Sequence, residues 1–243
     1  MKKYLCLILP VFILFACAKK NELLSTVSLN EYYPLQVGKF ISYNLDSTVF
    51  INFNTRDTVI RYQVKDSVDA KLTDNLGQPA YRIIRYVRKD ASRSWTPNNT
   101  FMAVQTPNSI EFVENNLRFI KLVLPIKQDY TWKGNRYLTF DPYPSYGFSS
   151  AFMDGWDYTY RDVNSSLIVG GLNYQNILTV AERDETLGDP KIAGTSYAEK
   201  TYSIEKYAKN IGLIYKEFIH WEYQGNNKSF KGFGVKLTIF DHN

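Results

Sequence analysis

The chain has 243 residues and a formal net charge of +5, which is too mild a positive charge to argue for nucleic-acid binding. Its two cysteines, Cys6 and Cys17, and its two histidines, His220 and His242, are too few for a disulfide framework or a multi-histidine metal centre, so we expect no metal and no cofactor. Aromatic residues make up 16% of the chain, against only 13 Gly and 9 Pro, and this composition predicts a packed β-rich protein.

The N-terminus has the pattern of a secretory signal. Lys2 and Lys3 form a basic start, and the apolar run that follows ends at Phe15 and is too short for a permanent membrane helix. The run closes with Leu14-Phe15-Ala16-Cys17, which resembles the lipobox of bacterial lipoproteins. This resemblance implies cleavage before Cys17, attachment of lipid, including palmitate, to that cysteine, and anchoring in the membrane through the lipid.

These features divide the chain into three parts. We expect a lipoprotein signal peptide over residues 1–16, a polar lipidated tether over residues 17–31, and a single antiparallel β domain over residues 32–243. Ala18, which follows the lipidated cysteine, resembles the residue found there in lipoproteins sorted to the outer membrane. We therefore predict a lipid-anchored protein of the bacterial outer membrane, with the periplasmic face favoured over the cell surface.

From residue 32 onward the chain is rich in β-branched and aromatic runs, and no segment shows a sustained helical period. These runs predict an all-β fold with little helix outside the signal peptide. The antiparallel sheets are expected to form either a sandwich or an open half-barrel. The predicted strands cover residues 37–45, 58–68, 80–88, 109–113, 117–124, 157–161 and 173–181.

The C-terminal region contains the clearest unit. In residues 213–223 apolar side chains such as Tyr215 occupy odd positions, while Lys216 and His220 occupy even ones, which predicts a half-buried strand with its odd face toward the core. A Gly/Asn-rich turn follows, and a second alternating run over residues 233–239 predicts an antiparallel hairpin. The stretch 196–210 fits a strand or a short helix, and the strand is favoured.

Two motifs resemble a known group of proteins. Tyr32-Tyr33-Pro34-Leu35-Gln36-Val37-Gly38, followed by Phe40 and Tyr43, resembles the Y-x-P-L-x-V-G-x-x-W-x-Y start of small Bacteroidetes-type lipoproteins, with Ile41 in place of the Trp. Gly212-Leu213-Ile214-Tyr215 resembles their second recurrent motif. The resemblance implies an all-β, envelope-anchored protein, and it implies no activity.

Residues 140–160 gather aromatic side chains on a Pro/Gly-rich backbone. Such rigid rings make good contacts for a glycan, a peptide or a partner protein. Alternatively, the segment folds over one end of the sheet and buries its rings in a small second core. If the segment is a binding surface, Trp156→Ala and Tyr146→Ala leave folding nearly intact and abolish binding. The candidate ligand-binding residues are Tyr143, Tyr146, Phe148, Trp156, Asp154 and Asp157.

No catalytic signature is present, because the chain lacks the G-x-S-x-G, H-E-x-x-H, P-loop and G-x-G-x-x-G motifs. A Ser-His-Asp triad is not expected, since His220 lies on the polar face of a predicted strand and His242 lies in a tail expected to fray. A glycan hydrolase needs only two carboxyl groups in a cleft. Asp154 and Asp157, with Asp162 nearby, are the candidates, although a turn with Asp at its corner is the favoured interpretation.

Three short motifs resemble the Asp-Ser/Thr sequon of Bacteroidetes-type protein O-glycosylation. Their candidate acceptors are Ser47, Thr58 and Ser67. Ser and Thr beside Asp are also ordinary in edge strands and turns.

Three functions therefore remain open. The first is a non-enzymatic envelope lipoprotein that binds an envelope protein or a glycan through its aromatic loop or a sheet face. The second is a lipid carrier or chaperone with an open half-barrel, which requires an unfilled apolar cavity. The third is a carboxylate-based glycan hydrolase, which requires Asp154 and Asp157 to face a cleft. The absence of catalytic signatures favours a protein that is not an enzyme, and the mild net charge favours one without a nucleic-acid partner.

Overall fold

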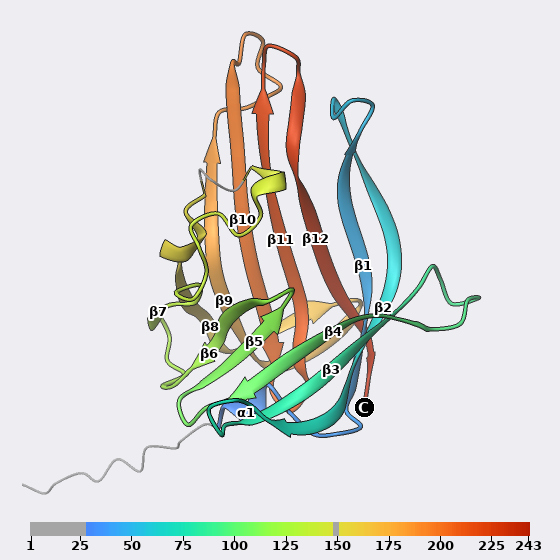
Figure 1. Ribbon diagram of the computed structural model, residues 1–243, viewed down its shortest axis with the longest axis vertical. Helices are drawn as coiled ribbons and strands as arrows, with labels where there is room; N and C mark the ends of the chain where they lie inside the picture. Colours follow the sequence, from blue (N-terminus) through green and yellow to red (C-terminus); the bar gives the residue numbers. More distant parts are fainter. Residues whose placement is uncertain (1–27, 148–150) are drawn as a thin grey trace, which may run out of the picture.

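The structure is a computed structural model that describes residues 28–147 and 151–243 (Figure 1). The predicted lipobox with Cys17 and the candidate residue Phe148 lie outside this part of the chain. The elements are α1 Leu29–Tyr32, β1 Phe40–Ile51, β2 Arg56–Thr73, β3 Pro79–Arg88, β4 Thr96–Gln105, β5 Ser109–Glu114, β6 Leu117–Val123, β7 Thr131–Lys133, η1 Pro144–Tyr146, η3 Met153–Gly155, β8 Asp157–Val169, β9 Leu172–Leu187, β10 Tyr197–Ala208, β11 Gly212–Gln224 and β12 Ser229–His242.

All the strands belong to one antiparallel sheet of 12 strands, in the order β6-β5-β4-β3-β2-β1-β12-β11-β10-β9-β8-β7. Neighbours in the sheet are neighbours in sequence, except that β1 pairs with β12, with Tyr43 opposite Ile239. This pairing joins the N-terminal and C-terminal halves at the middle of the sheet. The predicted all-β class is therefore confirmed, and the open half-barrel is the arrangement found rather than the sandwich.

The two edge strands, β6 and β7, approach each other and nearly close the sheet into a barrel. The Ile120 amide donates to the Gly134 carbonyl at 2.7 Å, and Trp132 Nε1 donates to the Ile120 carbonyl at 2.8 Å. The hydroxyl of Tyr160 on β8 accepts from Val123 N at 2.8 Å and donates to Val123 O at 2.7 Å. The side chains of Trp132 and Tyr160 thus satisfy backbone groups of β6 that would be unpaired at an exposed sheet edge.

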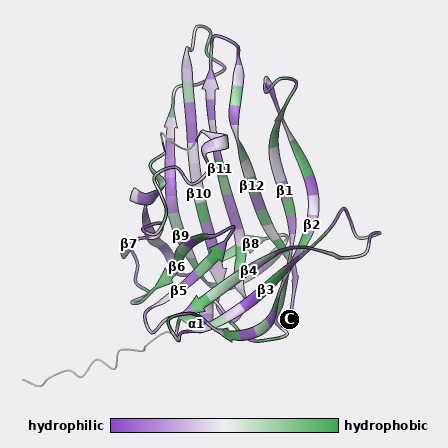
Figure 2. Cartoon of the chain, in the orientation of Figure 1, coloured by the Kyte–Doolittle hydropathy of each residue, from purple (hydrophilic) through white to green (hydrophobic). Residues whose placement is uncertain are grey.

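The molecule has a tall part and a lower part. The long strands β9 to β12 stand upright with β1 and β2, while β3 to β6 run across the lower half (Figure 1). Helix α1 lies at the lower end, where the C-terminus also lies (Figure 1). Hydrophobic and hydrophilic residues alternate along the tall strands, as the period of two requires (Figure 2).

The folded domain begins before Tyr32, so the expected boundary between tether and domain is too late in the chain. Leu29 and Tyr32 are only 4% and 1% exposed, and both belong to the largest hydrophobic cluster. The side chain of Ser28 caps α1 by accepting from the Asn30 amide. The Asn210 amide also donates to the carbonyl of Glu31, at 2.5 Å. The isolated apolar residues of this otherwise polar stretch therefore belong to the hydrophobic core.

The expected strands are present, including β10, which settles the 196–210 stretch as strand. The strand β4 was not predicted. β4 begins Thr-Pro-Asn-Asn, in which the proline and the two asparagines disfavour a strand, and only its second half is apolar. Its pairing with β3, with Tyr81 opposite Ala103, overrides that local preference.

The C-terminal tail does not fray as expected. β12 continues to His242, which lies opposite Ile41 on β1. Beyond it, Asn243 Oδ1 accepts from the Phe40 amide at 2.8 Å, and Asn243 Nδ2 donates to the Gly38 carbonyl at 3.0 Å. Backbone pairing in the middle of the sheet holds this end in place.

The predicted hairpin of β11 and β12 is confirmed, but the assignment of its faces is wrong. The even residues Lys216 and Phe218 line the interior, and His220 is fully buried. Tyr215, on the odd face, packs against a Lys236 ammonium group 5.9 Å from its ring. Because the interior of this half-barrel contains charged groups, the more polar face of β11 points inward.

Candidate ligand-binding site

The lower half of the half-barrel encloses a pocket with a volume of about 350 Å³. Strands from both halves of the sheet line it, together with the segment that follows α1 and the segment between β7 and β8. Most of the lining is apolar, and includes Leu35, Tyr43, Ile83, Phe119, Trp156 and Leu237. Folded interiors contain few voids larger than a water molecule, so a space of this size is not ordinary core packing.

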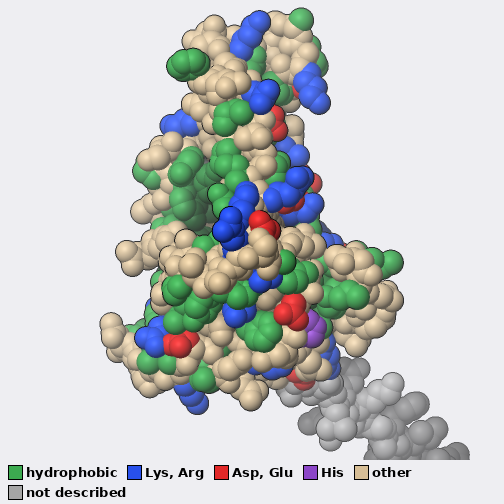
Figure 3. Space-filling model, turned by 90° about the vertical axis from the view of Figure 1, so that its right-hand side faces the viewer, with side chains coloured by type: hydrophobic (Ala, Val, Ile, Leu, Met, Phe, Trp, Pro, Cys, Tyr) green, Lys and Arg blue, Asp and Glu red, His purple; other side chains and the backbone are tan. Residues whose placement is uncertain are grey.

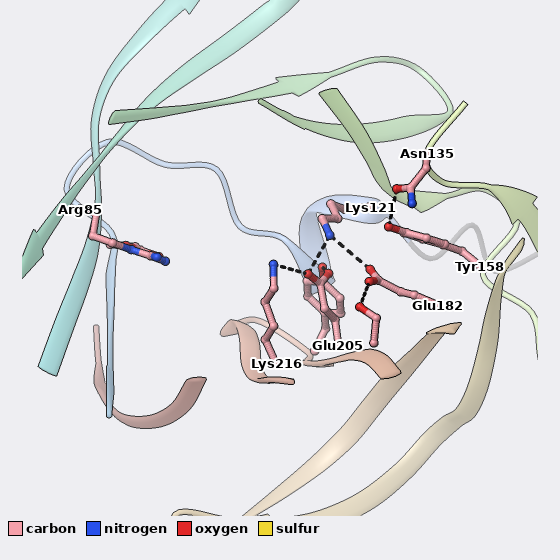
Figure 4. Close-up of polar contacts among 10 residues, drawn as sticks. Arg85, Lys121, Asn135, Tyr158, Glu182, Glu205 and Lys216 are labelled. Atoms are coloured by element: carbon pink, nitrogen blue, oxygen red, sulfur yellow. Dashed lines mark hydrogen bonds and ion pairs between the residues drawn. The ribbon is translucent and has the colours of Figure 1, made fainter. Parts of the chain in front are cut away.

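Four charged side chains meet on one wall of this pocket (Figure 4). Lys121 Nζ on β6 lies 2.8 Å from Glu205 Oε1 on β10 and 3.2 Å from Glu182 Oε1 on β9. Lys216 Nζ on β11 approaches the same Glu205 oxygen at 3.2 Å. We call these four residues the ion cluster.

Hydroxyl groups complete the bonding of the two carboxylates. Tyr207 donates to Glu205 Oε2 at 2.5 Å, and Ser203 donates a short hydrogen bond to Glu182 Oε2. Both glutamate side chains are almost fully buried. Such carboxylates are tolerated in an interior only when they are paired and hydrogen-bonded.

The surroundings of the ion cluster are aromatic. Lys121 Nζ lies 5.0 Å from the centre of the Phe119 ring and 5.7 Å from that of Tyr158. The Tyr158 ring occupies the space that a Cβ at residue 134 would need, and Gly134 makes this packing possible. The Tyr158 hydroxyl donates to Asn135 Oδ1 at 2.7 Å.

The electrostatics of the two glutamates differ. Burial works against ionisation of Glu205, but Lys121 and Lys216 outweigh it and lower its pKa to about 2. Burial raises the pKa of Glu182, because the neighbouring Lys121 compensates only in part and the Glu205 carboxylate adds repulsion. Glu205 is therefore the ionised partner of the two lysines, and Glu182 holds a proton more readily than an exposed glutamate.

A second charged pair lines the same pocket from the opposite half of the sheet. Arg85 on β3 binds Asp66 on β2 through two hydrogen bonds, Nε to Oδ1 at 2.7 Å and Nη2 to Oδ2 at 2.6 Å. The guanidinium carbon lies 4.7 Å from the centre of the Phe101 ring. Figure 4 shows Arg85 extending toward the side of the pocket where Lys216 lies.

The predicted aromatic residues differ in burial and in position relative to the pocket. Tyr143 and Trp156 line the pocket, and Trp156 is only 1% exposed. Tyr146 is 44% exposed and its ring lies 4.8 Å from that of Phe233, beside a second groove that shares Tyr143 and Phe233 with the pocket. The expectation that Trp156 forms an exposed contact surface is wrong, because its ring packs into the core.

The predicted carboxylate pair does not face the pocket. Asp154 lies in η3 and Asp157 begins β8, and both are exposed, as is Asp162. Asp157 forms a surface ion pair with Lys133 at 2.8 Å. The arrangement required for glycan hydrolysis is therefore not found at these three residues.

His220 is buried rather than on a polar surface. Its Nδ1 lies 2.8 Å from the Thr201 hydroxyl and its Nε2 lies 3.1 Å from the Gly147 carbonyl. Burial lowers its pKa. The ring is thus a hydrogen-bonded structural histidine that connects β11 to the end of η1.

The three candidate glycosylation residues, Ser47, Thr58 and Ser67, are half-buried within β1 and β2. Ser47 lines the groove beside Tyr146. O-glycosylation at these positions stays a prediction.

Residues 28–147 and 151–243 contain no group of three or more His, Cys, Asp or Glu side chains that could hold a metal ion. None of the helices in this described part of the chain is long and apolar enough to cross a membrane.

Sequence reasoning missed the ion cluster. One signal was available, because Lys121 interrupts the apolar run Phe119-Ile120-Lys121-Leu122-Val123, where a charge inside a buried strand calls for a partner. The partners themselves could not be identified, since Glu182 is 61 residues away and Glu205 is 84 residues away.

No protein-family model and no curated protein matches the chain. Among solved structures it is similar to a protein described as exported, with a YmcC-like fold, from Bacteroides fragilis, at 11% identity and a TM-score of 0.39 over 85% of this chain and 97% of that one. It is also similar to a DUF1329 family protein from Desulfovibrio piger, at 11% identity and a TM-score of 0.18 over 87% and 88% of the two chains. At these TM-scores neither likeness assigns a function or a ligand to this chain.

Proposed function

We propose that this protein is a lipid-anchored binding protein of the bacterial cell envelope that holds an amphipathic small molecule inside its half-barrel. The observation that carries the proposal is the pocket of about 350 Å³, whose apolar walls also present charged side chains. Ligand pockets are typically concave and mostly apolar, with a few placed polar groups that orient the ligand. Of the functions that the sequence leaves open, this is closest to the lipid carrier.

The envelope location rests on the sequence. The Leu14-Phe15-Ala16-Cys17 motif and the short apolar run before it support export and lipidation at Cys17. The first described residue, Ser28, already caps a helix of the domain, and few residues separate it from the proposed anchor at Cys17. We infer that the protein works at the outer membrane, on the periplasmic side.

A second groove, next to the pocket, offers a place for a partner. The groove beside Tyr146 is lined by Val49, Phe230 and Phe233, and Phe233 also lines the pocket. In a side view, hydrophobic side chains lie in a hollow above the middle of the molecule, with Lys and Arg side chains beside it (Figure 3). An envelope protein or a glycan is the proposed partner at such a surface.

The proposal is tested by filling the pocket. Val235 on β12 lines it, and Val235→Phe adds a ring to its volume. We expect the wild-type protein to bind the neutral probe N-phenyl-1-naphthylamine with one saturable site, and Val235→Phe to weaken binding by at least about tenfold, or 1.4 kcal/mol. Fluorescence titration measures both affinities.

The matched control is Val59→Phe, because Val59 lies on β2 and is 42% exposed. It introduces the same ring outside the pocket and should leave the affinity unchanged. Circular dichroism checks that both variants are folded, and Leu45→Phe, which fills the same pocket from β1, replaces Val235→Phe if that variant is not. Equal affinities in all folded variants, or no saturable binding by the wild type, would exclude the interior as the binding site.

A further inference from the structure

We infer that the pocket selects amphipathic molecules with an anionic head, a carboxylate or a phosphate monoester, and that Lys216 binds this head. The inference rests on the proposed function, since it names the ligand class of the same pocket. The inference follows from which donors and acceptors of the ion cluster already have protein partners and which remain accessible.

The two carboxylates of the ion cluster are poorly accessible to a ligand. The side chains of Glu182 and Glu205 are only 4% and 2% exposed. Each oxygen of Glu205 has a protein donor, with Lys121 and Lys216 at Oε1 and Tyr207 at Oε2. Each oxygen of Glu182 also has one, Lys121 at Oε1 and Ser203 at Oε2. A cationic head would therefore have to reach a buried carboxylate that protein donors already cover.

The cations of the pocket are less fully engaged. Lys216 has three N–H donors, and among the described residues its ammonium group has one partner, the Glu205 oxygen at 3.2 Å. Its side chain is also the most exposed of the ion cluster, at 20%, compared with 7% for Lys121 and 2% for Glu205. The most accessible bonding capacity at this wall therefore consists of the Lys216 donors, and an anionic head supplies the matching acceptors.

Arg85 provides a second group of donors on the opposite wall. Asp66 engages its Nε and Nη2, and the structure describes no hydrogen bond at Nη1. Glu114 also lines the pocket and contributes negative charge near Arg85. Because of these two carboxylates, we assign the anionic head to Lys216 and a supporting role to Arg85.

The raised pKa of Glu182 acts in the same direction. Burial favours the neutral form of Glu182, whereas Glu205 is the ionised partner of the two lysines. The apolar part of the ligand then lies against the remainder of the pocket, which includes Tyr43, Phe119 and Leu237. An interior ionic cluster adds little stability compared with apolar packing, so its retention next to an open pocket is consistent with ligand recognition.

The test compares decyl compounds that differ only in the head group: decanoate, decyl phosphate, decanol and decyltrimethylammonium. Each competes with N-phenyl-1-naphthylamine for the full-length protein at concentrations where it is monomeric. We expect at least one of the two anions to bind about tenfold or more tightly than decanol, and the ammonium compound to bind more weakly than decanol. The ranking of decanoate and decyl phosphate distinguishes the two sources of an anionic head.

Lys216→Met tests the assignment of the residue. It leaves Glu205 paired with Lys121, so the protein is expected to fold, and it should reduce the preference for the anion over decanol to less than about twofold. Lys216→Arg keeps the charge and should keep the preference. Lys236→Met is the matched control, because Lys236 points to the outer side of β12 beside Tyr215.

The outcomes separate the two proposals. If decanol binds but neither anion is preferred, or if the ammonium compound is preferred, the anionic head is ruled out while interior binding stands. If the preference survives in a folded Lys216→Met, Lys216 is not the binding residue. If no decyl compound binds the wild type, both proposals fail.

Discussion

Trp156 and Tyr146 belong to the same segment over the pocket but differ in burial. Trp156 is 1% exposed, and its Nε1 donates to the Ala151 carbonyl at 2.7 Å. Tyr146 is 44% exposed, with its ring against Phe233. One ring therefore contributes to the core, and the other remains available for an outside contact.

Mutation of these two residues should give unequal effects. We expect Trp156→Ala to lower the free energy of unfolding by about 3–5 kcal/mol, because it leaves a cavity in the core. Tyr146→Ala should cost about 1 kcal/mol or less, since an exposed ring loses little burial. Urea unfolding followed by circular dichroism measures both, and similar losses for the two variants would contradict the assigned burial.

At the scale of elements, the junction between β6 and the β7–β8 edge determines whether the sheet closes. The Tyr160 hydroxyl bonds to both the amide and the carbonyl of Val123. Tyr160 itself is fully buried, and its ring lies 4.5 Å from that of Trp132. One side chain thus connects two strands that lack a regular ladder between them.

Tyr160→Phe should loosen this junction. It removes the partner of two backbone groups of Val123, and we expect a loss of about 1–3 kcal/mol in the free energy of unfolding. Hydrogen exchange of the Val123 amide should accelerate, while exchange of the Leu237 amide in the centre of the sheet should not. The control is Tyr130→Phe, since Tyr130 is 37% exposed. Unchanged exchange at Val123 would show that β6 is held by other contacts.

At the scale of the whole molecule, the start of the described chain and its C-terminus both lie at the lower end (Figure 1). A lipid at Cys17 would therefore bring this end toward the membrane, because few residues separate Cys17 from Ser28. The tall strands would then extend away from the bilayer.

The anchor is tested by Cys17→Ser. We expect the mature wild-type protein to sediment with outer membranes and to carry the mass of a lipidated cysteine, whereas Cys17→Ser should lose the lipid mass and the membrane association. Cys6→Ser, within the predicted signal peptide, is the matched control and should leave both unchanged. Proteinase added to intact cells should not remove the protein, and its removal would place it on the cell surface.

The sequence predicts the strands better than it predicts the pocket and the ion cluster. Most strands were located correctly, because β-branched and aromatic runs are a local signal, but β1, β8 and β9 continue well past their predicted ends. β4 was missed, since its Pro97 and its asparagines disfavour a strand and only pairing with β3 compensates. For β11, alternation identified the strand but not which face points inward, since an interior that contains Lys216 and His220 inverts the usual pattern.

By itself, the sequence determined the all-β class, the C-terminal hairpin and the candidate export signal, because each depends on residues that are close along the chain. Only the tertiary structure decided that β1 pairs with β12, that the sheet curls around a pocket, and that Lys121, Glu182, Glu205 and Lys216 meet there. These four residues come from β6, β9, β10 and β11. Their proximity depends on the curvature of the whole sheet, which no local pattern of residues specifies.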